Sequence, residues 1–182
     1  MRTLLTILLL NASIVGQVFA LEIGQSLPTL EIDSRGELLL ADDEYSYQAW
    51  QVPMEMDKPQ VIQYLAGRKS ARAQSKPFTD RLEQDLPEGS VHVTTVINLD
   101  DAMWGTSGFV LSEVKKSKRK YPMSTIVLDE DGTGLQTWQL QEGGANILVL
   151  NASGTVLYMK QGAMSEGEIE STLEMIKLEL TP

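Results

Sequence analysis

The sequence predicts an α/β domain in which helices cover both faces of a mixed central sheet. Strand-like and helix-like segments alternate along most of the chain after residue 20, and parallel strands are joined by crossovers of this kind. Two strand-like segments near the end are separated by a short turn, which indicates an antiparallel hairpin. With 182 residues, of which 42% are hydrophobic, the chain can bury the core of about one domain.

The first 20 residues are predicted to be a secretory signal peptide, and residues 21–182 a single mature domain. Arg2 precedes the apolar stretch 4–10, and small residues occupy the last and third-last positions before the expected cleavage after Ala20. A membrane anchor is the competing interpretation, but polar residues interrupt a segment that would need about 20 mostly apolar residues to span a bilayer. We therefore expect an exported protein with no membrane span after cleavage.

The mature domain begins with a predicted extra β-hairpin, ahead of the alternating strands and helices. Residues 30–33 alternate between apolar and polar side chains, and residues 38–40 are three leucines. Residues 34–37, Ser-Arg-Gly-Glu, are typical of a turn. This pattern predicts two short strands joined by a turn.

The middle of the chain predicts two strands with a helix between them. Residues 59–67 form the first strand, which we expect at the centre of the sheet. Residues 91–98 form the second, and their apolar and β-branched side chains are typical of a strand buried on both faces. Between them, residues 70–86 place apolar side chains at helical intervals, and we expect Pro77 to kink or break this helix.

The rest of the chain predicts a helix, a strand, a hairpin and a closing helix. The helix covers residues 107–120, and we expect Phe109 on its apolar side. Residues 125–128 form a strand closed by a turn, and residues 147–158 form the hairpin. Residues 165–168, Ser-Glu-Gly-Glu, match a capping box and open the last helix.

This order of elements is that of a thioredoxin-like domain, a three-layer sandwich, although other α/β sandwiches share much of it. Six short segments add a more specific resemblance: Gly24–Pro28, Asp33–Leu38, Tyr45–Trp50, Ala66–Ala71, Asn98–Ala102 and Trp138–Leu140. Together they resemble the YtfJ family of bacterial periplasmic proteins, over essentially the whole mature chain. The resemblance implies a periplasmic location and a thioredoxin-like fold, similar in layout to peroxiredoxins and membrane-tethered thiol-disulfide proteins. It implies no particular activity.

The chain contains no cysteine, which excludes a disulfide framework, a thiol nucleophile and a dithiol redox pair. In the redox-active proteins of similar layout, the first central strand runs into Cys-x-x-Cys at the start of a helix, whereas here it runs into Gly67–Arg72. Residues 143–146, Gly-Gly-Ala-Asn, stand where those proteins carry a cis-proline and a threonine. We therefore expect no thiol oxidoreductase activity. His92 is the only histidine, which excludes a two-histidine metal site.

Residues at the expected start of the helix 70–86 are candidates for binding an anion. Arg68, Lys69 and Arg72 gather there beside the Ser70 hydroxyl. Helix N-termini present unpaired N–H groups and partial positive charge, which suit carboxylate or phosphate groups. The alternative is that Ser70 caps the helix and the cations are solvated.

Asp100 and Asp101 follow the second central strand, so we expect them at the carboxyl edge of the sheet, where open α/β sheets bind ligands. A carboxylate pair could hold a divalent cation or transfer protons. We favour capping of the following turn, because no further oxygen ligand is spaced nearby. In the next loop Trp104 is expected to be exposed and to contact a ligand, whereas Trp50 and Trp138 are expected in the core.

A second candidate surface is a basic interaction patch at the end of the helix 107–120. Five of the 15 cations lie there within six residues: Lys115, Lys116, Lys118, Arg119 and Lys120. Against a net charge of -10, this patch suits an acidic partner, lipid headgroups or the phosphates of lipopolysaccharide. The alternative, which we favour, is a solvated helix end whose cations complement the helix dipole. The acidic balance of the whole chain argues against nucleic-acid binding.

We therefore predict a non-catalytic periplasmic binding module on a thioredoxin-like scaffold, with no cofactor and no metal site. Its partner is expected to be a periplasmic protein or an anionic small molecule, and no nucleic acid. The alternative is an enzyme that uses Arg68, Asp100 and Asp101 in place of thiols. A hydrolase has little support, because the sequence contains no Gly-x-Ser-x-Gly motif.

Overall fold

A seven-stranded mixed sheet forms the centre of the computed structural model, which describes residues 21–103 and 105–180. In chain order its strands are β1 (Glu31–Ala41), β2 (Glu44–Gln51), β3 (Gln60–Ala66), β4 (His92–Asn98), β5 (Thr125–Asp129), β6 (Ala145–Leu150) and β7 (Val156–Gln161). The helices are α1 (Lys69–Asp85), α2 (Ser107–Lys120), α3 (Thr133–Thr137) and α4 (Glu166–Glu179). Across the sheet the strands follow the order β2-β1-β5-β4-β3-β6-β7. The neighbours β3, β4 and β5 are parallel, and the other pairs are antiparallel.

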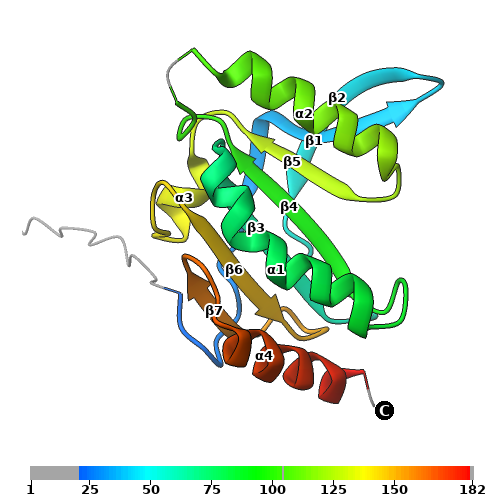
Figure 1. The fold of residues 1–182 in the computed structure, drawn as a ribbon, viewed down its shortest axis with the longest axis vertical. Coiled ribbons are helices and arrows are strands. Elements are labelled where there is room, and N and C mark those ends of the chain that lie inside the picture. Colours follow the sequence, from blue (N-terminus) through cyan, green and yellow to red (C-terminus); the bar gives the residue numbers. More distant parts are fainter. Residues whose placement is uncertain (1–20, 104, 181–182) are drawn as a thin grey trace, which may run out of the picture.

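The three long helices share one face of the sheet, because α1 and α4 pack together over β3 and β6 and α2 packs over β5. Figure 1 shows α1 crossing in front of the strands, with α2 above it and α4 below it. Successive side chains along a strand point to opposite faces, so the residues of β3 reveal what covers each face of the sheet. Val61 packs with Phe78 of α1 and Ile176 of α4, whereas Tyr64 packs around Trp138, just after α3. The second face is therefore covered by the short α3 and by irregular chain, including the segment before β1.

The N-terminal hairpin exists, but its turn is not where the sequence pattern predicted it. β1 continues through residues 34–37, and the chain reverses at Asp42 and Asp43, whose φ angles are 49° and 64°. Gly36 has a φ of 76° and lies in a stretch of β1 where the register with β2 shifts. The predicted turn is thus a β-bulge within one long strand. β2, which the pattern did not predict, is an edge strand.

Two expectations about the middle of the chain differ from the structure in part. α1 runs through Pro77 without ending, because burying side chains such as Phe78 and Leu82 outweighs the missing N–H, so Pro77 does not break the helix. β4 is fully buried on only one face. On its other face Val93 contacts the core beneath α1 and Ile97 contacts the core beneath α2, so the strand lies below the boundary between two helices.

The last part of the chain follows the prediction with one addition. α3 occupies a region where only a turn was expected, and it begins where Asp129 accepts hydrogen bonds from the backbone N–H groups of Thr133 and Gly134 at 2.9 and 2.8 Å. The capping box before α4 is confirmed in both halves. Hydrogen bonds from Lys160 and Ser165 lower the pKa of the Glu168 carboxyl in that box to about 2.

Two of the three tryptophans lie in the described core. Trp50 and Trp138 are buried in the core, as predicted, with 5% and 1% of their surface exposed. Trp104 lies outside the described residues, as does the predicted signal peptide over residues 1–20. Over the described ranges, no helix is both long and apolar enough to cross a membrane.

Candidate functional site

The predicted ligand-binding edge lies where the carboxyl ends of β3 and β4 meet. Gly67, between β3 and α1, donates from its backbone N–H to the Asn98 carbonyl oxygen at 2.8 Å. A Cβ atom at residue 67 would lie 2.9 Å from that same oxygen. Only glycine allows this close approach, which holds the start of α1 against the loop after β4.

Arg68 and Asp101 form the centre of this edge. The Nη2 atom of Arg68 donates to Oδ1 of Asp101 at 2.6 Å, and its Nε donates to the Asp101 backbone oxygen at 2.8 Å. The backbone N–H of Gly143 donates to Oδ2 of the same carboxylate. Only 10% of the Asp101 side chain is exposed, against 39% of the Arg68 side chain. One nearly buried carboxylate therefore joins the start of α1, the loop after β4 and the loop before β6.

The residues proposed to bind an anion at this helix start are only partly available for it. The Arg68 guanidinium is already paired with Asp101, and Ser70 lies within the first turn of α1 rather than at its cap. The N-cap residue is Arg68, without a capping hydrogen bond from its side chain, so the expectation that Ser70 caps the helix was wrong. The Lys69 ammonium lies 4.9 Å from the centre of the Phe109 ring and thereby links α1 to α2.

Asp100 and Asp101 do not act as a pair. Asp100 lines a separate cavity of about 330 Å³ beside Arg35 and Glu130, which are joined by two hydrogen bonds of 2.9 and 3.1 Å. The expectation that the aspartates cap the following turn fails for Asp101, whose carboxylate serves Arg68 and Gly143 instead. The side chain of Asn98 closes that turn by accepting from the Asp101 backbone N–H at 3.2 Å. Among the described residues, no group of three or more His, Asp or Glu side chains is placed to hold a metal ion.

Two large apolar side chains lie exposed between the end of β4 and the first turn of α2. Met103, in the loop after β4, is 62% exposed, and Phe109, in the first turn of α2, is 50% exposed. The expectation that Phe109 faces the core was wrong, because the first turn of α2 presents this ring to the Lys69 ammonium. Each of these large exposed apolar side chains is a candidate for contact with a partner.

A buried polar group beneath the edge was not anticipated from the sequence. The Tyr64 hydroxyl donates to Oδ2 of Asp129 at 2.7 Å and accepts from the backbone N–H of Leu135 at 2.9 Å. Both side chains are fully buried. Burial, reinforced by the neighbouring Asp129 carboxylate, raises the pKa of the Tyr64 hydroxyl far above its usual value of 10.0. These contacts hold α3 and need no ligand to satisfy them.

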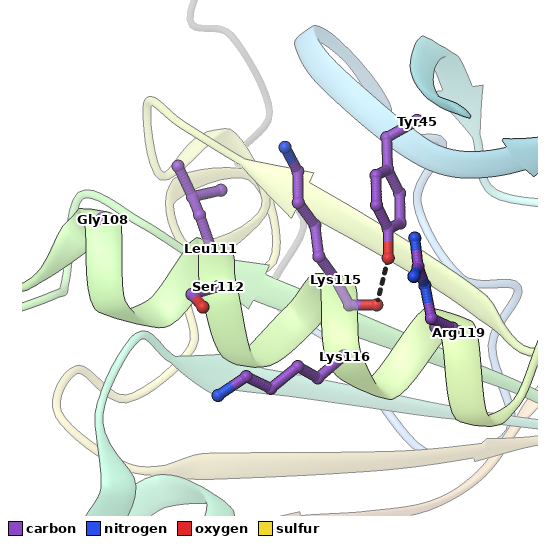
Figure 2. Close-up of a pocket in the computed structure, with 7 residues that line it drawn as sticks. All are labelled: Tyr45, Gly108, Leu111, Ser112, Lys115, Lys116 and Arg119. Atoms are coloured by element: carbon purple, nitrogen blue, oxygen red, sulfur yellow. Dashed lines mark hydrogen bonds between the residues drawn. The ribbon is translucent and has the colours of Figure 1, made fainter. Parts of the chain in front are cut away.

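The basic patch on α2 does not present all five cations to solvent. Lys118 is only 5% exposed, and its ammonium donates to the Ser124 carbonyl oxygen at 2.6 Å. It therefore fastens the end of α2 to the start of β5, and its place in an interaction patch was a wrong prediction. Three of the other four line a groove of about 420 Å³, shown in Figure 2 with Tyr45, Gly108, Leu111, Ser112, Lys115, Lys116 and Arg119. The fifth cation, Lys120, lies 4.8 Å from the centre of the Tyr121 ring.

Part of this groove could have been found in the sequence. Residues 108, 112, 115 and 119 recur every three or four positions, which places them on one side of a helix. Tyr45 could not have been added, because it reaches the groove from the unpredicted strand β2. The role of Gly143 was equally hidden, because a backbone N–H group carries no sequence signature.

Residues 21–179 match a family model described as a bacterial protein of unknown function, YtfJ_HI0045. The chain belongs to the YtfJ family. A relative from Escherichia coli (strain K12), the uncharacterized protein YtfJ, is 32% identical over 178 residues, with 97% of each chain covered. The resemblance expected from the six sequence segments is thereby confirmed.

Comparison with solved structures identifies the fold of this chain. A Chlorobium tepidum structure assigned as the thiol:disulfide interchange protein DsbE superposes with a TM-score of 0.60 and 15% identity, covering 89% of this chain and 100% of that one. A peroxiredoxin-like protein from Aquifex aeolicus gives a TM-score of 0.54 and 15% identity, with 88% and 89% covered. At such identities the likeness concerns the fold alone. The protein thus has a thioredoxin-like fold and no cysteine.

Proposed function

We propose that this YtfJ-family protein is a periplasmic, non-redox binding module that uses the edge around Arg68 and Asp101 as its binding surface. The pattern of residues 1–20 supports export. The chain has no cysteine and therefore cannot perform the thiol chemistry that the name of the structurally similar thiol:disulfide interchange protein indicates for that protein. What remains for function is the shape and charge of the edge.

The closed network at Arg68, Asp101 and Gly143 carries this proposal. A catalytic group at this edge would need a free lone pair or an exchangeable proton within reach of a substrate. Here both carboxylate oxygens of Asp101 accept hydrogen bonds from within the protein, and nine-tenths of the side chain is buried. Such a group stiffens the three segments that it joins, and its burial leaves little of it within reach of a substrate, which favours binding over catalysis.

The chemistry of the exposed edge indicates what it would bind. Met103 and Phe109 offer apolar surface, and Lys69 adds a positive charge against the Phe109 ring. An extended segment of another periplasmic protein, carrying apolar and acidic side chains, would complement both features.

A photo-crosslinking amino acid at residue 109 tests this surface in intact cells. We expect it to capture one defined periplasmic protein, and we expect Lys69→Glu to weaken the capture because it reverses the charge beside the ring. The matched control places the same crosslinker at Glu174, an exposed position on α4. Equal capture from both positions, or capture unaffected by Lys69→Glu, would contradict the proposal.

Two further measurements address location and chemistry. Cell fractionation with mass spectrometry is expected to find the protein in the periplasm with Leu21 as its first residue. A full-length chain retained in the cytoplasm would refute that part of the proposal. A saturable small-anion shift of the thermal midpoint that Asp100→Ala abolishes would favour an enzyme over a binding module, with its site at the cavity that Asp100 lines.

A further inference from the structure

We propose that the groove between Tyr45 and α2 is a second binding site, separate from the edge at Arg68, and that it takes a phosphate-bearing ligand. The groove is lined by the seven residues of Figure 2 and has a volume of about 420 Å³. Small-molecule sites have volumes of about 300–1,000 Å³, so the groove has room for a ligand of the size of pyrophosphate or a sugar phosphate. The inference does not depend on the function proposed above.

The charge of the groove is opposite to that of the protein. The whole chain carries a formal charge of -10, yet Lys115, Lys116 and Arg119 line the groove together with the Ser112 hydroxyl. Its described lining contains no carboxylate. Positive potential confined to one groove of an acidic protein attracts an anionic ligand to that groove in preference to the rest of the surface.

An aromatic ring, rather than a carboxylate, holds two of these cations. The Lys115 ammonium lies 5.1 Å and the Arg119 guanidinium 5.7 Å from the centre of the Tyr45 ring. The Tyr45 hydroxyl donates to the Lys115 backbone oxygen at 2.9 Å, which fixes the ring against α2, as Figure 2 shows. A ring orients a cation without neutralising it, so both charges stay available to a ligand.

Ion pairs take up little of this positive charge. In the described part of the chain Lys115 forms no ion pair, and Arg119 approaches Asp43 only at 3.8 Å, with 57% and 88% of the two side chains exposed. Lys116 pairs with Glu113 at 2.7 Å, but 71% of the Lys116 side chain is exposed. Exposed pairs of this kind are weak and exchange readily, so a multiply charged ligand can displace them.

The arrangement of donors favours phosphate over a single carboxylate. A phosphate group has at least three acceptor oxygens and a charge near two. The Arg119 guanidinium supplies a planar fork of N–H donors, and the Lys115 ammonium supplies a point charge on the other side of the Tyr45 ring, as Figure 2 shows. Lys118, buried and bonded to Ser124, is a structural lysine, whereas Lys115, Lys116 and Arg119 line the groove.

Isothermal titration of the protein with inorganic pyrophosphate at low ionic strength tests the proposal. We expect saturable binding that is at least about 10-fold weaker in the variant Lys115→Gln/Arg119→Gln, because each lost charge-assisted contact is typically worth about that factor. The matched control Lys76→Gln/Lys177→Gln removes the same charge from two exposed helix positions that pair with Asp80 and Glu174. We expect this control to bind as the wild type does.

Sedimentation with lipid vesicles distinguishes the two sources of phosphate. Binding to phosphatidylglycerol but not phosphatidylcholine vesicles, lost in Lys115→Gln/Arg119→Gln, would identify a lipid headgroup as the ligand. Pyrophosphate binding without vesicle binding would identify a free phosphate compound. If neither ligand binds, or if both double variants weaken binding equally, the groove is not a phosphate site. Unchanged circular dichroism of both variants confirms that they are folded.

Discussion

The Tyr64 hydroxyl and the Asp129 carboxylate form the most enclosed polar contact beneath the sheet edge. Substituting Tyr64→Phe would leave Asp129 without one donor and the Leu135 backbone N–H without its acceptor. We expect the free energy of unfolding at neutral pH to fall by about 1–3 kcal/mol, since buried groups would lose their partners. Urea unfolding monitored by fluorescence measures this, with the exposed Tyr121→Phe as the matched control.

The same substitution makes a prediction about alkaline pH. The pKa of Tyr64 is raised in the folded state above the ordinary value of 10.0. Its contribution to stability is therefore complete below pH 10.0 and is lost as the pH rises further toward the folded pKa. The difference in unfolding free energy between wild type and Tyr64→Phe should shrink above that pH. A difference that stays constant would show that the hydroxyl is not protected from ionisation.

Asp101 allows a direct test of the closed edge. Asp101→Ala removes the carboxylate that accepts from the Arg68 Nη2 and the Gly143 backbone N–H, and we expect it to lower the unfolding free energy by about 1–3 kcal/mol. Glu130→Ala breaks the more exposed pair with Arg35 and should cost less than about 1 kcal/mol. If urea unfolding showed that the two variants lose the same unfolding free energy, the Asp101 network would stabilise the fold no more than an exposed ion pair does.

The candidate site could be predicted from the sequence only as a set of residues. Arg68, Asp100 and Asp101 were placed at the carboxyl edge because they follow recognisable strands. Their interactions could not be predicted, because Arg68 and Asp101 are 33 residues apart and Gly143 is a further 42 residues along the chain. Only the folded loops decide that Asp101 meets both partners while Asp100 faces another cavity.

Among the secondary-structure elements, the predicted ones depend on local patterns and the missed ones depend on distant contacts. The long helices and the C-terminal hairpin were predicted from apolar spacing and from the Ser165 capping box. The short α3 was missed, since its start depends on Asp129 and on Tyr64, which lies 65 residues from Asp129. The sequence predicts a turn where the structure has the bulge at Gly36, because a glycine among polar residues is typical of both.

Gly36 allows a test of the pairing between β1 and β2. Its φ is 76°, and a Cβ atom there would lie 2.0 Å from the Gln48 carbonyl oxygen of the paired strand β2. We expect Gly36→Ala to lower the unfolding free energy by more than about 2 kcal/mol, because the clash adds to the cost of the left-handed backbone. Gly24 has a similar φ of 86° but open space around it. The control Gly24→Ala should therefore lower the unfolding free energy by only about 1 kcal/mol. Similar thermal midpoints for the two variants would show that the β2 backbone moves away from residue 36 at little cost in stability.

At the scale of the whole molecule, charge is distributed unevenly over a thioredoxin-like scaffold. The formal net charge is -10, and excess charge of one sign opposes the compact state. The groove on α2, in contrast, gathers three cations. Added salt screens both effects, but screening should stabilise the protein and weaken ligand binding in the groove.

These opposite responses provide a test that involves the whole chain. Raising the ionic strength from about 10 mM to about 150 mM shortens the Debye length from about 30 Å to about 8 Å. We expect the thermal midpoint to rise, because repulsion among the acidic groups is screened, while the affinity for pyrophosphate falls. In Lys115→Gln/Arg119→Gln, whose net charge is two units more negative, the midpoint should rise at least as much, with little affinity left to lose. If salt left the pyrophosphate affinity of the wild type unchanged, the groove cations would not be the groups that bind it.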